Sequence, residues 1–330
     1  MIETRQLGLF YRGFKAVDNV SFCLKKGEVT GLLGHNGAGK TTLMRMLSGE
    51  LEPSTGSVIF DGKPLLSNRR ELAARMGYLP ESPPFYPELS VVEFLDYAAG
   101  MQGVRGAGKA ARIRGVLQKT GLTAVALKKI GRLSRGYQQR VALAQAIVHQ
   151  PDFIMLDEPS NGLDPVQSGE LRQLLQSLSS TSAVLLSTHV LSEVEQSCDR
   201  VLVMRAGKLV VDQYLDTLVA GKLINLSCSL SPARLVECCH GDFEVQQHAL
   251  VADGVYQYRL SLSETSAMTI EQFAAFMASS ILATGERLYT LDSQKTTLQS
   301  FVQTALVEQH TKQADGKPFD VNASGKPEEC

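Results

Sequence analysis

The hydrophobic positions of this chain follow two spacings in turn. Short, mainly apolar runs, typical of strands buried on both faces, occur at Val29–Leu33, Phe153–Leu156 and Ala183–Ser187. Over Gln167–Leu178, apolar residues recur instead with helical spacing. This alternation of buried strands and helices predicts an α/β domain.

The segments around this alternation have their own patterns. Residues 1 to about 62 predict a β-rich part, with strands at Val17–Leu24 and Ser57–Phe60. Residues from about 82 to 150 predict a helical subdomain, with helices at Val91–Ala99, Ala110–Lys119 and Tyr137–His149. A hairpin of Val201–Met204 and Lys208–Val211 closes the first domain, which we expect to span residues 1–218.

A different pattern begins after residue 218. Ile224, Leu226, Cys228 and Leu230 alternate with polar residues, as in a half-buried strand, and helical spacing recurs at Pro232–Cys239, Thr269–Leu282 and Thr296–Val307. We therefore expect a small α+β accessory domain over residues 219–309. Residues 310–330 are polar and contain few apolar side chains, which predicts a disordered tail.

Composition narrows the class of protein. The 330 residues are 44% hydrophobic and 20% charged, as in an ordinary globular protein, and the formal net charge of −1 gives no general attraction to nucleic acid. No apolar run reaches the ~20 residues of a membrane span, and the N-terminus lacks a signal core. We expect a protein on the cytoplasmic side, with no nucleic acid among its partners.

The segment Gly34–Thr41 matches the phosphate-binding pattern G-x-x-x-x-G-K-[ST] and joins a predicted strand to a predicted helix, Lys40–Leu47. Unpaired amides and the helix dipole converge at such a junction, so a polyphosphate is the expected occupant. Glycines at 34, 37 and 39 allow close approach of the backbone. Lys40 reaches the β- and γ-phosphates, and the Thr41 hydroxyl is a ligand for Mg²⁺.

Two carboxylates, Asp157 and Glu158, follow the apolar run Phe153–Leu156. Asp157 suits Mg²⁺, and Glu158 suits a general base that takes a proton from the attacking water. Without the phosphate-binding loop, an ordinary acidic turn would explain this pair equally well.

Five further motifs follow in one order. They are Tyr11, Gly77–Glu81, Leu133–Arg140, Ser160–Asp164 and His189. With the phosphate-binding loop and Asp157-Glu158, this set resembles the ATP-binding subunit of an ATP-binding cassette (ABC) transporter. In that family these segments are the adenine-stacking aromatic, the Q-loop, the signature sequence, the D-loop and the switch histidine.

The resemblance implies a P-loop NTPase of the ABC ATPase type, with a mixed sheet and β-rich and helical subdomains, that binds ATP and Mg²⁺. It assigns catalysis to Lys40, Glu158 and His189, and metal binding to Thr41, Asp157 and Glu81. Nucleotide contacts fall to Tyr11, Gly34, His35, Asn36, Gly37, Ala38, Gly39, Lys40, Thr41, Thr42, Ser134 and Gly136.

The family pairs two subunits around two ATP molecules, so the expected partners are a second copy, or a homologue in a pseudo-dimer, and an integral membrane permease. Ser134 and Gly136 of one subunit would face the γ-phosphate bound by the other. Three departures from the family pattern stand nearby: Glu81 for the usual Gln, Arg135 for Gly and Tyr137 for Gln. Arg135 adds a cation that can neutralise phosphate charge.

Three classes of function fit an ABC ATPase: a transport ATPase, a soluble ABC protein in another process, and a module that only holds nucleotide. The single phosphate-binding loop and the complete set of catalytic residues favour transport. Within transport, a drug- or polysaccharide-exporter ATPase at the cytoplasmic face of the inner membrane is the main expectation, and an importer ATPase is the alternative. Ser82–Leu95 is the expected permease contact, or else an internal packing loop.

Overall fold

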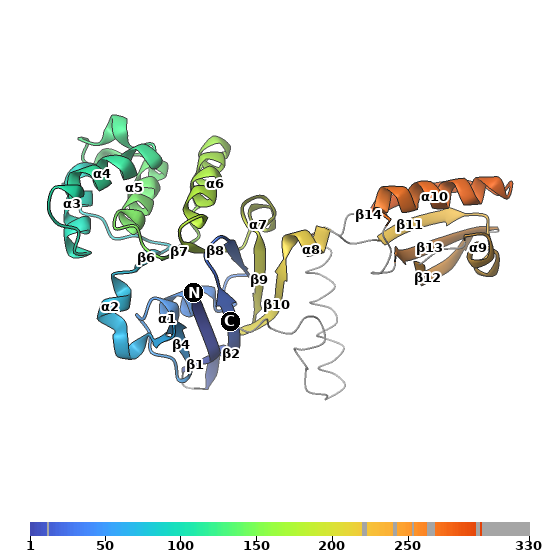
Figure 1. Cartoon of the computed structure of the whole chain (residues 1–330), viewed down its shortest axis with the longest axis horizontal. Coiled ribbons are helices and arrows are strands. Elements are labelled where there is room, and N and C mark those ends of the chain that lie inside the picture. The colour runs from blue at the N-terminus through green and yellow to red at the C-terminus, as the bar shows by residue number, and fades with distance from the viewer. Residues whose placement is uncertain are drawn as a thin grey trace. The chain divides into compact units, whose positions relative to one another are not determined.

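The chain forms two compact units that divide between Leu215 and Asp216 (Figure 1). The structure is a computed structural model that describes residues 1–11, 13–219, 223–239, 243–252, 254–262, 268–294 and 298. Apart from Leu298, the helix expected at Thr296–Val307 and the tail expected over 310–330 lie outside the described residues. Among the helices of the described ranges, none has the length and apolar content to cross a bilayer.

A six-stranded sheet with the order β10-β9-β3-β8-β7-β6 forms the centre of the first unit. All its pairs are parallel except β9–β10, which is the hairpin predicted from the sequence. Hydrophobic clusters cover both faces, so its central strands are buried almost throughout. The strands are β3 (Val29–Leu33), β6 (Met76–Leu79), β7 (Phe153–Asp157), β8 (Ala183–Thr188), β9 (Arg200–Arg205) and β10 (Lys208–Tyr214).

An antiparallel sheet, β2-β1-β4-β5, is the β-rich part of this unit. Helix α1 (Lys40–Leu47) shares one core with it, in which Leu7 and Phe22 from the sheet join Leu43 and Met44 from the helix. The strands are β1 (Ile2–Tyr11), β2 (Phe14–Leu24), β4 (Thr55–Phe60) and β5 (Lys63–Pro64). The sequence did not predict β1 because its pairing register shifts repeatedly, which breaks the alternation of buried and exposed residues.

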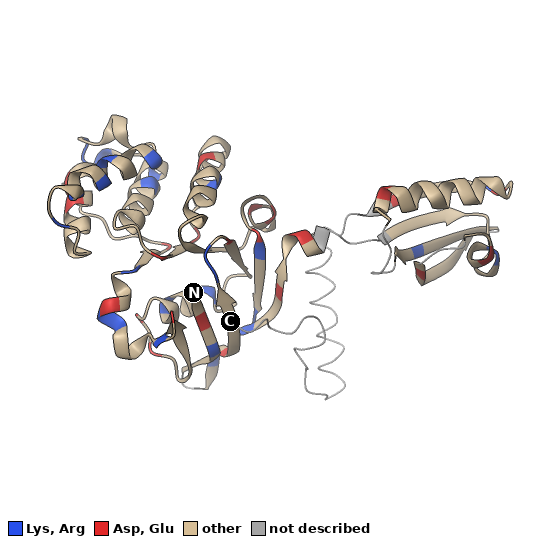
Figure 2. Ribbon diagram, viewed as in Figure 1, with Lys and Arg blue, Asp and Glu red and all other residues tan. Residues whose placement is uncertain are grey.

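The helical segment consists of α3 (Val91–Met101), α4 (Gly108–Lys119) and α5 (Arg135–Ile147), with short 3-10 turns at Thr123–Val125 and Ile130–Arg132. Helix α5 begins two residues before the predicted start because the hydroxyl of Ser134 caps its first turn. Figure 2 marks Lys and Arg positions along α4 and α5 in blue.

The remaining helices of this unit lie outside that segment. They are η1 (Leu66–Asn68), α2 (Arg69–Ala73), α6 (Pro165–Ser179) and α7 (Leu191–Ser197), and the short helix α8 (Leu215–Val219) spans the boundary between the two units.

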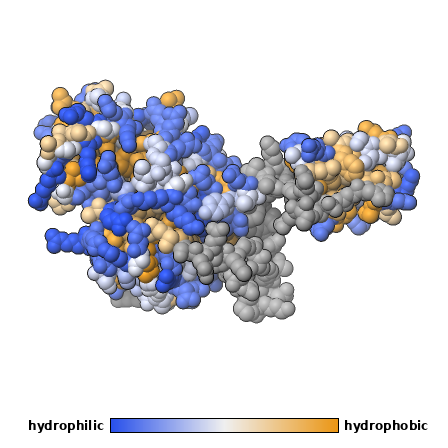
Figure 3. Space-filling model, in the orientation of Figure 1, coloured by the Kyte–Doolittle hydropathy of each residue, from blue (hydrophilic) through white to orange (hydrophobic). Residues whose placement is uncertain are grey.

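The second unit is an antiparallel sheet, β12-β13-β11-β14, packed against α9 (Pro232–Cys238) and α10 (Ile270–Ala283). The helix predicted over Thr269–Leu282 is confirmed as α10. Strand β12 (Phe243–Ala252) was not predicted because most of its residues are exposed and only the first four alternate between half-buried and exposed. The other strands are β11 (Leu223–Cys228), β13 (Val255–Leu262) and β14 (Leu288–Gln294). Figure 3 shows apolar residues on the visible surface of this unit.

Candidate nucleotide-binding site

The loop between β3 and α1 requires its three glycines for different reasons. At Gly34 a side chain would come within 2.7 Å of the Met204 carbonyl oxygen. Gly37 has open space but a φ of +80°, in the left-handed region. Gly39 combines a φ of +105° with a Cβ position only 2.5 Å from the Ala16 carbonyl oxygen. The loop therefore has a fixed shape that larger residues cannot adopt.

Lys40 carries the positive charge of this loop. Its side chain is buried, and its ammonium donates to the Gly34 carbonyl oxygen at 2.7 Å and lies 3.5 Å from an oxygen of Glu158. Before it, His35, Asn36 and Gly37 are exposed, Ala38 is buried and Gly39 is half-buried; after it, Thr41 is exposed and Thr42 half-buried. The first turn of α1 contains no acidic residue, so its amides and the ammonium can face an anion together.

Asp157 has a carboxylate oxygen that lacks a protein partner. The residue is fully buried at the end of β7, and its Oδ1 accepts a hydrogen bond from the Ser187 hydroxyl, whereas Oδ2 has no hydrogen-bond partner. A buried, unpartnered carboxylate oxygen is costly unless a cation approaches it. Together with the exposed hydroxyl of Thr41, this donor set fits Mg²⁺, which prefers one or two protein oxygens plus phosphates.

Glu158 has the backbone geometry of a sharp turn, with a φ of +50° that non-glycine residues adopt at a cost of about 1–2 kcal/mol. Two hydrogen bonds hold this turn, from its amide to the Ser187 carbonyl oxygen at 3.2 Å and to the Ser187 hydroxyl at 3.1 Å. As a result the carboxylate lies between Lys40 and His189, whose Nδ1 is 2.9 Å from Oε2. The structure thus brings together the three residues that the sequence marked as catalytic.

Ser187 is the residue of this site whose role the sequence did not reveal. It contacts Asp157 through its hydroxyl and fixes the Glu158 turn through the same oxygen. In the sequence it is only a small polar residue within an apolar strand. Many serines with a purely structural role show the same pattern.

The other predicted contacts lie on neighbouring elements. Tyr11 ends β1, pairs with Phe14 across the hairpin, and is 49% exposed, as an adenine-stacking ring requires. Glu81 is exposed and follows β6, whose Leu79 pairs with Leu156 one residue before Asp157.

Ser134 and Gly136 lie at the N-terminus of α5. The Ser134 hydroxyl accepts from the Tyr137 amide, and Gly136 is buried where a side chain would come within 2.5 Å of Gln167 on α6. Gln167 itself forms a capping box with Asp164. Within the described residues, no hydrogen bond or ion pair joins Ser134 or Gly136 to Lys40, Glu158 or His189.

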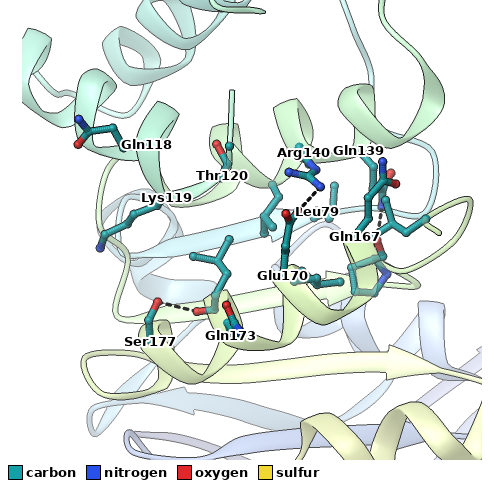
Figure 4. A pocket seen from close by; sticks show the side chains of 16 residues that line it. Leu79, Gln118, Lys119, Thr120, Gln139, Arg140, Gln167, Glu170, Gln173 and Ser177 are labelled. Atoms are coloured by element: carbon teal, nitrogen blue, oxygen red, sulfur yellow. Dashed lines mark hydrogen bonds and ion pairs between the residues drawn. The ribbon is translucent and has the colours of Figure 1, made fainter. Parts of the chain in front are cut away.

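Helices α5 and α6 also meet through polar contacts around a pocket of about 390 Å³ (Figure 4). Arg140 forms an ion pair with Glu170, and the Gln139 amide donates to the Pro159 carbonyl oxygen at 3.1 Å. Since Pro159 directly follows Glu158, these contacts tie helix α5 to the loop that carries the Glu158 carboxylate.

The fold and this site define a P-loop ATPase, and comparisons with known proteins agree. The family model for ABC transporters matches residues 17–161. The chain is 41% identical to YxlF, an uncharacterized ABC transporter ATP-binding protein of Bacillus subtilis, over 63% of this chain and 69% of that protein. It is 35% identical to the bacitracin transport ATP-binding protein BcrA of Bacillus licheniformis, over 77% and 83%.

A dimeric structure of a bacterial ABC transporter cassette superposes with a TM-score of 0.61 at 25% identity, over 65% of this chain and 99% of that one. The chain belongs to the ATP-binding subunits of ABC transporters. As in that family, it binds ATP with Mg²⁺ and hydrolyses it.

We expect Ser187→Ala to lower the ATPase rate by about tenfold to a hundredfold, because it removes the hydroxyl that bonds the Asp157 carboxylate and the backbone amide of Glu158. Nucleotide affinity should change little, since Lys40 and the loop amides remain. The measurement is steady-state ATPase activity together with equilibrium binding of a fluorescent ATP analogue.

Ser182→Ala is the matched control, because this buried hydroxyl lies just before the start of the same strand and donates only to the Pro151 carbonyl oxygen, at 2.7 Å. Equal loss of activity in both variants would mean that Ser187 acts through stability alone.

Proposed function

We propose that two copies of this chain clasp two ATP molecules and drive a separately encoded membrane permease that exports its substrate. The observation that carries the proposal is the Lys40–Glu158–His189 contact chain next to the unpartnered oxygen of Asp157. It combines a phosphate-binding cation, a candidate general base and a candidate Mg²⁺ ligand at one edge of the sheet.

The pairing between Lys40 and Glu158 suggests how substrate binding prepares catalysis. In the structure, the Glu158 carboxylate neutralises the Lys40 ammonium. A bound polyphosphate competes for this ammonium and leaves the carboxylate able to accept a proton from water. General base catalysis of this kind raises reaction rates about 10²- to 10⁴-fold. His189 holds the other carboxylate oxygen, and so orients the base. Mg²⁺ on Asp157 and Thr41 would neutralise charge on the phosphates.

The exposed start of α5 supports a site shared between two copies. Ser134 and Arg135, at the start of helix α5, are exposed. A helix N-terminus with an adjacent guanidinium suits a phosphate presented by another molecule. The similarity to a dimeric cassette supports the same arrangement.

We expect Glu158→Gln to bind ATP, to hydrolyse it at least a hundredfold more slowly, and to accumulate as a dimer. The amide keeps the shape of the side chain but cannot act as a base, so the ATP that bridges the copies persists. Sedimentation velocity at millimolar ATP measures the dimer.

Lys40→Ala serves as the comparison, because loss of the ammonium should abolish both ATP turnover and ATP-dependent dimerisation. A Glu158→Gln chain that stays monomeric at every ATP concentration would contradict the shared site, and a Lys40→Ala chain with native activity would contradict the catalytic assignment.

An aromatic cluster of Phe85, Tyr86, Phe94 and Tyr97 supports the proposed permease contact. Tyr86 lies edge-on to Tyr97 with ring centroids 5.7 Å apart, and these two rings are 47% and 49% exposed. Met101, at the end of helix α3, which also carries Tyr97, is 71% exposed. Exposed apolar side chains at this density mark an interaction site, and a permease would place this chain at the membrane surface.

We expect the double substitution of Tyr86 and Tyr97 by Ser to weaken co-purification with the permease at least tenfold while basal ATPase activity stays within twofold, because the cluster contributes contact area and no catalytic group. Leu66→Ser, at a residue that is 43% exposed outside the cluster, is the control. Full retention of permease by the double variant would exclude this contact.

Export is proposed on two features. A single ATPase domain precedes a small α+β unit, and the segment Leu79–Pro84 resembles that of the exporter ATPases within the ABC family.

In inside-out vesicles that hold the chain with its permease, we expect external ATP to drive amphiphilic fluorescent drugs into the lumen. Accumulation in right-side-out vesicles loaded with ATP would indicate import instead.

A further inference from the structure

The helical segment has a strong charge bias that the catalytic site does not use. Between Asp96 and Asp152 the chain carries ten Lys and Arg residues and no Asp or Glu, although its formal net charge is only −1. Those that lie on α4 and α5 are among the positions coloured blue in Figure 2. Such a concentration of one sign raises the local concentration of anions.

Within this segment, a cavity of about 310 Å³ lies where the loop after α3 enters α4. Its lining includes Gln102, Gly103, Arg105, Gly108, Arg112 and His149, and no carboxylate among the described residues. No ion pair engages Arg105 or Arg112 in the described part of the chain, and the Arg112 guanidinium donates only a long hydrogen bond, 3.4 Å, to the His149 carbonyl oxygen.

The N-terminus of α4 opens at this cavity without a cap. Its N-cap residue, Ala107, offers no side-chain hydrogen bond, and the first turn contains no acidic residue. Gly108, the first residue of the helix, lines the cavity. The amides of this first turn therefore have a partial positive charge that no side chain of the helix neutralises.

His149 is the independent sign of a ligand. The residue is only 8% exposed, lines the cavity, and has one ring nitrogen, Nδ1, without a hydrogen-bond partner. Its other nitrogen, Nε2, lies 3.0 Å from the Met76 carbonyl oxygen and so donates its hydrogen there. A buried polar atom left unpaired costs about 1–3 kcal/mol, which a ligand in the cavity would recover.

We propose that this cavity binds the phosphate group of a small molecule or of a lipid headgroup, at a site separate from the nucleotide loop. Arg105 and Arg112 provide the counter-charge, the Gly108 amide at the start of α4 donates to a phosphate oxygen, and His149 completes the shell. The site lies two residues beyond the end of the signature helix α5, and its histidine bonds the first residue of β6. Occupancy can therefore influence the elements on both sides of the ATPase centre.

Binding should also take up a proton. Burial lowers the pKa of His149, and the neighbouring Arg112 guanidinium lowers it further, so without a ligand the imidazole is neutral at neutral pH. An anion next to the ring offsets the effect of Arg105 and Arg112, and the C-terminal end of α5 favours the charged form. Protonated Nδ1 then donates to the anion, so affinity rises as the pH falls.

The test uses sulfate, because it stays dianionic between pH 5.5 and 8 and any pH dependence then belongs to the protein. The full chain with Lys40→Ala, which disables the nucleotide loop, is titrated with sodium sulfate in a calorimeter. We expect binding that weakens about tenfold or more when Arg105→Gln or Arg112→Gln is added, because each removes a charged hydrogen-bond donor.

Arg114→Gln is the matched control, since it removes the same charge from α4 at an exposed residue that does not line the cavity. His149→Gln should abolish the rise in sulfate affinity at low pH. Absence of sulfate binding at pH 5.5, or equal losses in Arg112→Gln and Arg114→Gln, would overturn the proposal.

A second comparison separates the two sources of phosphate. Glycerol phosphate is titrated in solution, and vesicles of phosphatidate with phosphatidylcholine are tested by flotation against vesicles of phosphatidylcholine alone. Binding that depends on Arg112 in the first arm identifies a soluble ligand, and in the second a lipid headgroup. Dependence on Arg112 in neither arm would refute the site.

Discussion

The arrangement of this ATPase depends on one buried contact, between the ammonium of Lys40 and the carboxylate of Glu158. Both side chains are almost fully buried, so each charge would be strongly destabilised without the other. The two residues lie far apart in the sequence, and the central sheet brings them together because Lys40 begins the helix after β3 and Glu158 directly follows β7. A polyphosphate is the natural replacement for the carboxylate, since it offers the ammonium a denser negative charge.

Strand register determines whether this contact can form. Leu33 pairs with Thr188 where β3 meets β8, and Asp157 pairs with Ser187 where β7 meets β8. The carboxyl ends of three parallel strands therefore meet at one edge, as in other open α/β sheets. A shift of one residue in β7 would move Asp157 away from Ser187 and turn its side chain to the other face of the sheet.

The sequence predicted the parts of the site that short motifs determine and missed those that tertiary packing determines. The phosphate-binding loop, Asp157 and Glu158 could be assigned to one site because a short motif and its strand–helix context mark them in the sequence, and the structure brings them together. Ser187 was not, because its contact with Asp157 crosses strands 30 residues apart. Strands β1 and β12 were missed because bulges or exposure remove the period-two pattern, and the unpaired nitrogen of His149 arises only from burial.

Helix α5 links these observations physically. Its first residues follow Ser134, and His149 lies just beyond its last turn, roughly 20 Å away for a helix of this length. Near its N-terminal end it contacts α6 through Gly136 against Gln167 and the ion pair of Arg140 with Glu170. The two helices also contribute Leu143, Leu174 and Leu175 to one hydrophobic cluster, and separating apolar surface costs about 25 cal/mol per Å². Apolar packing and these polar contacts therefore hold α5 against α6 together, so the helix joins the turn at Ser134 to His149 as one packed element.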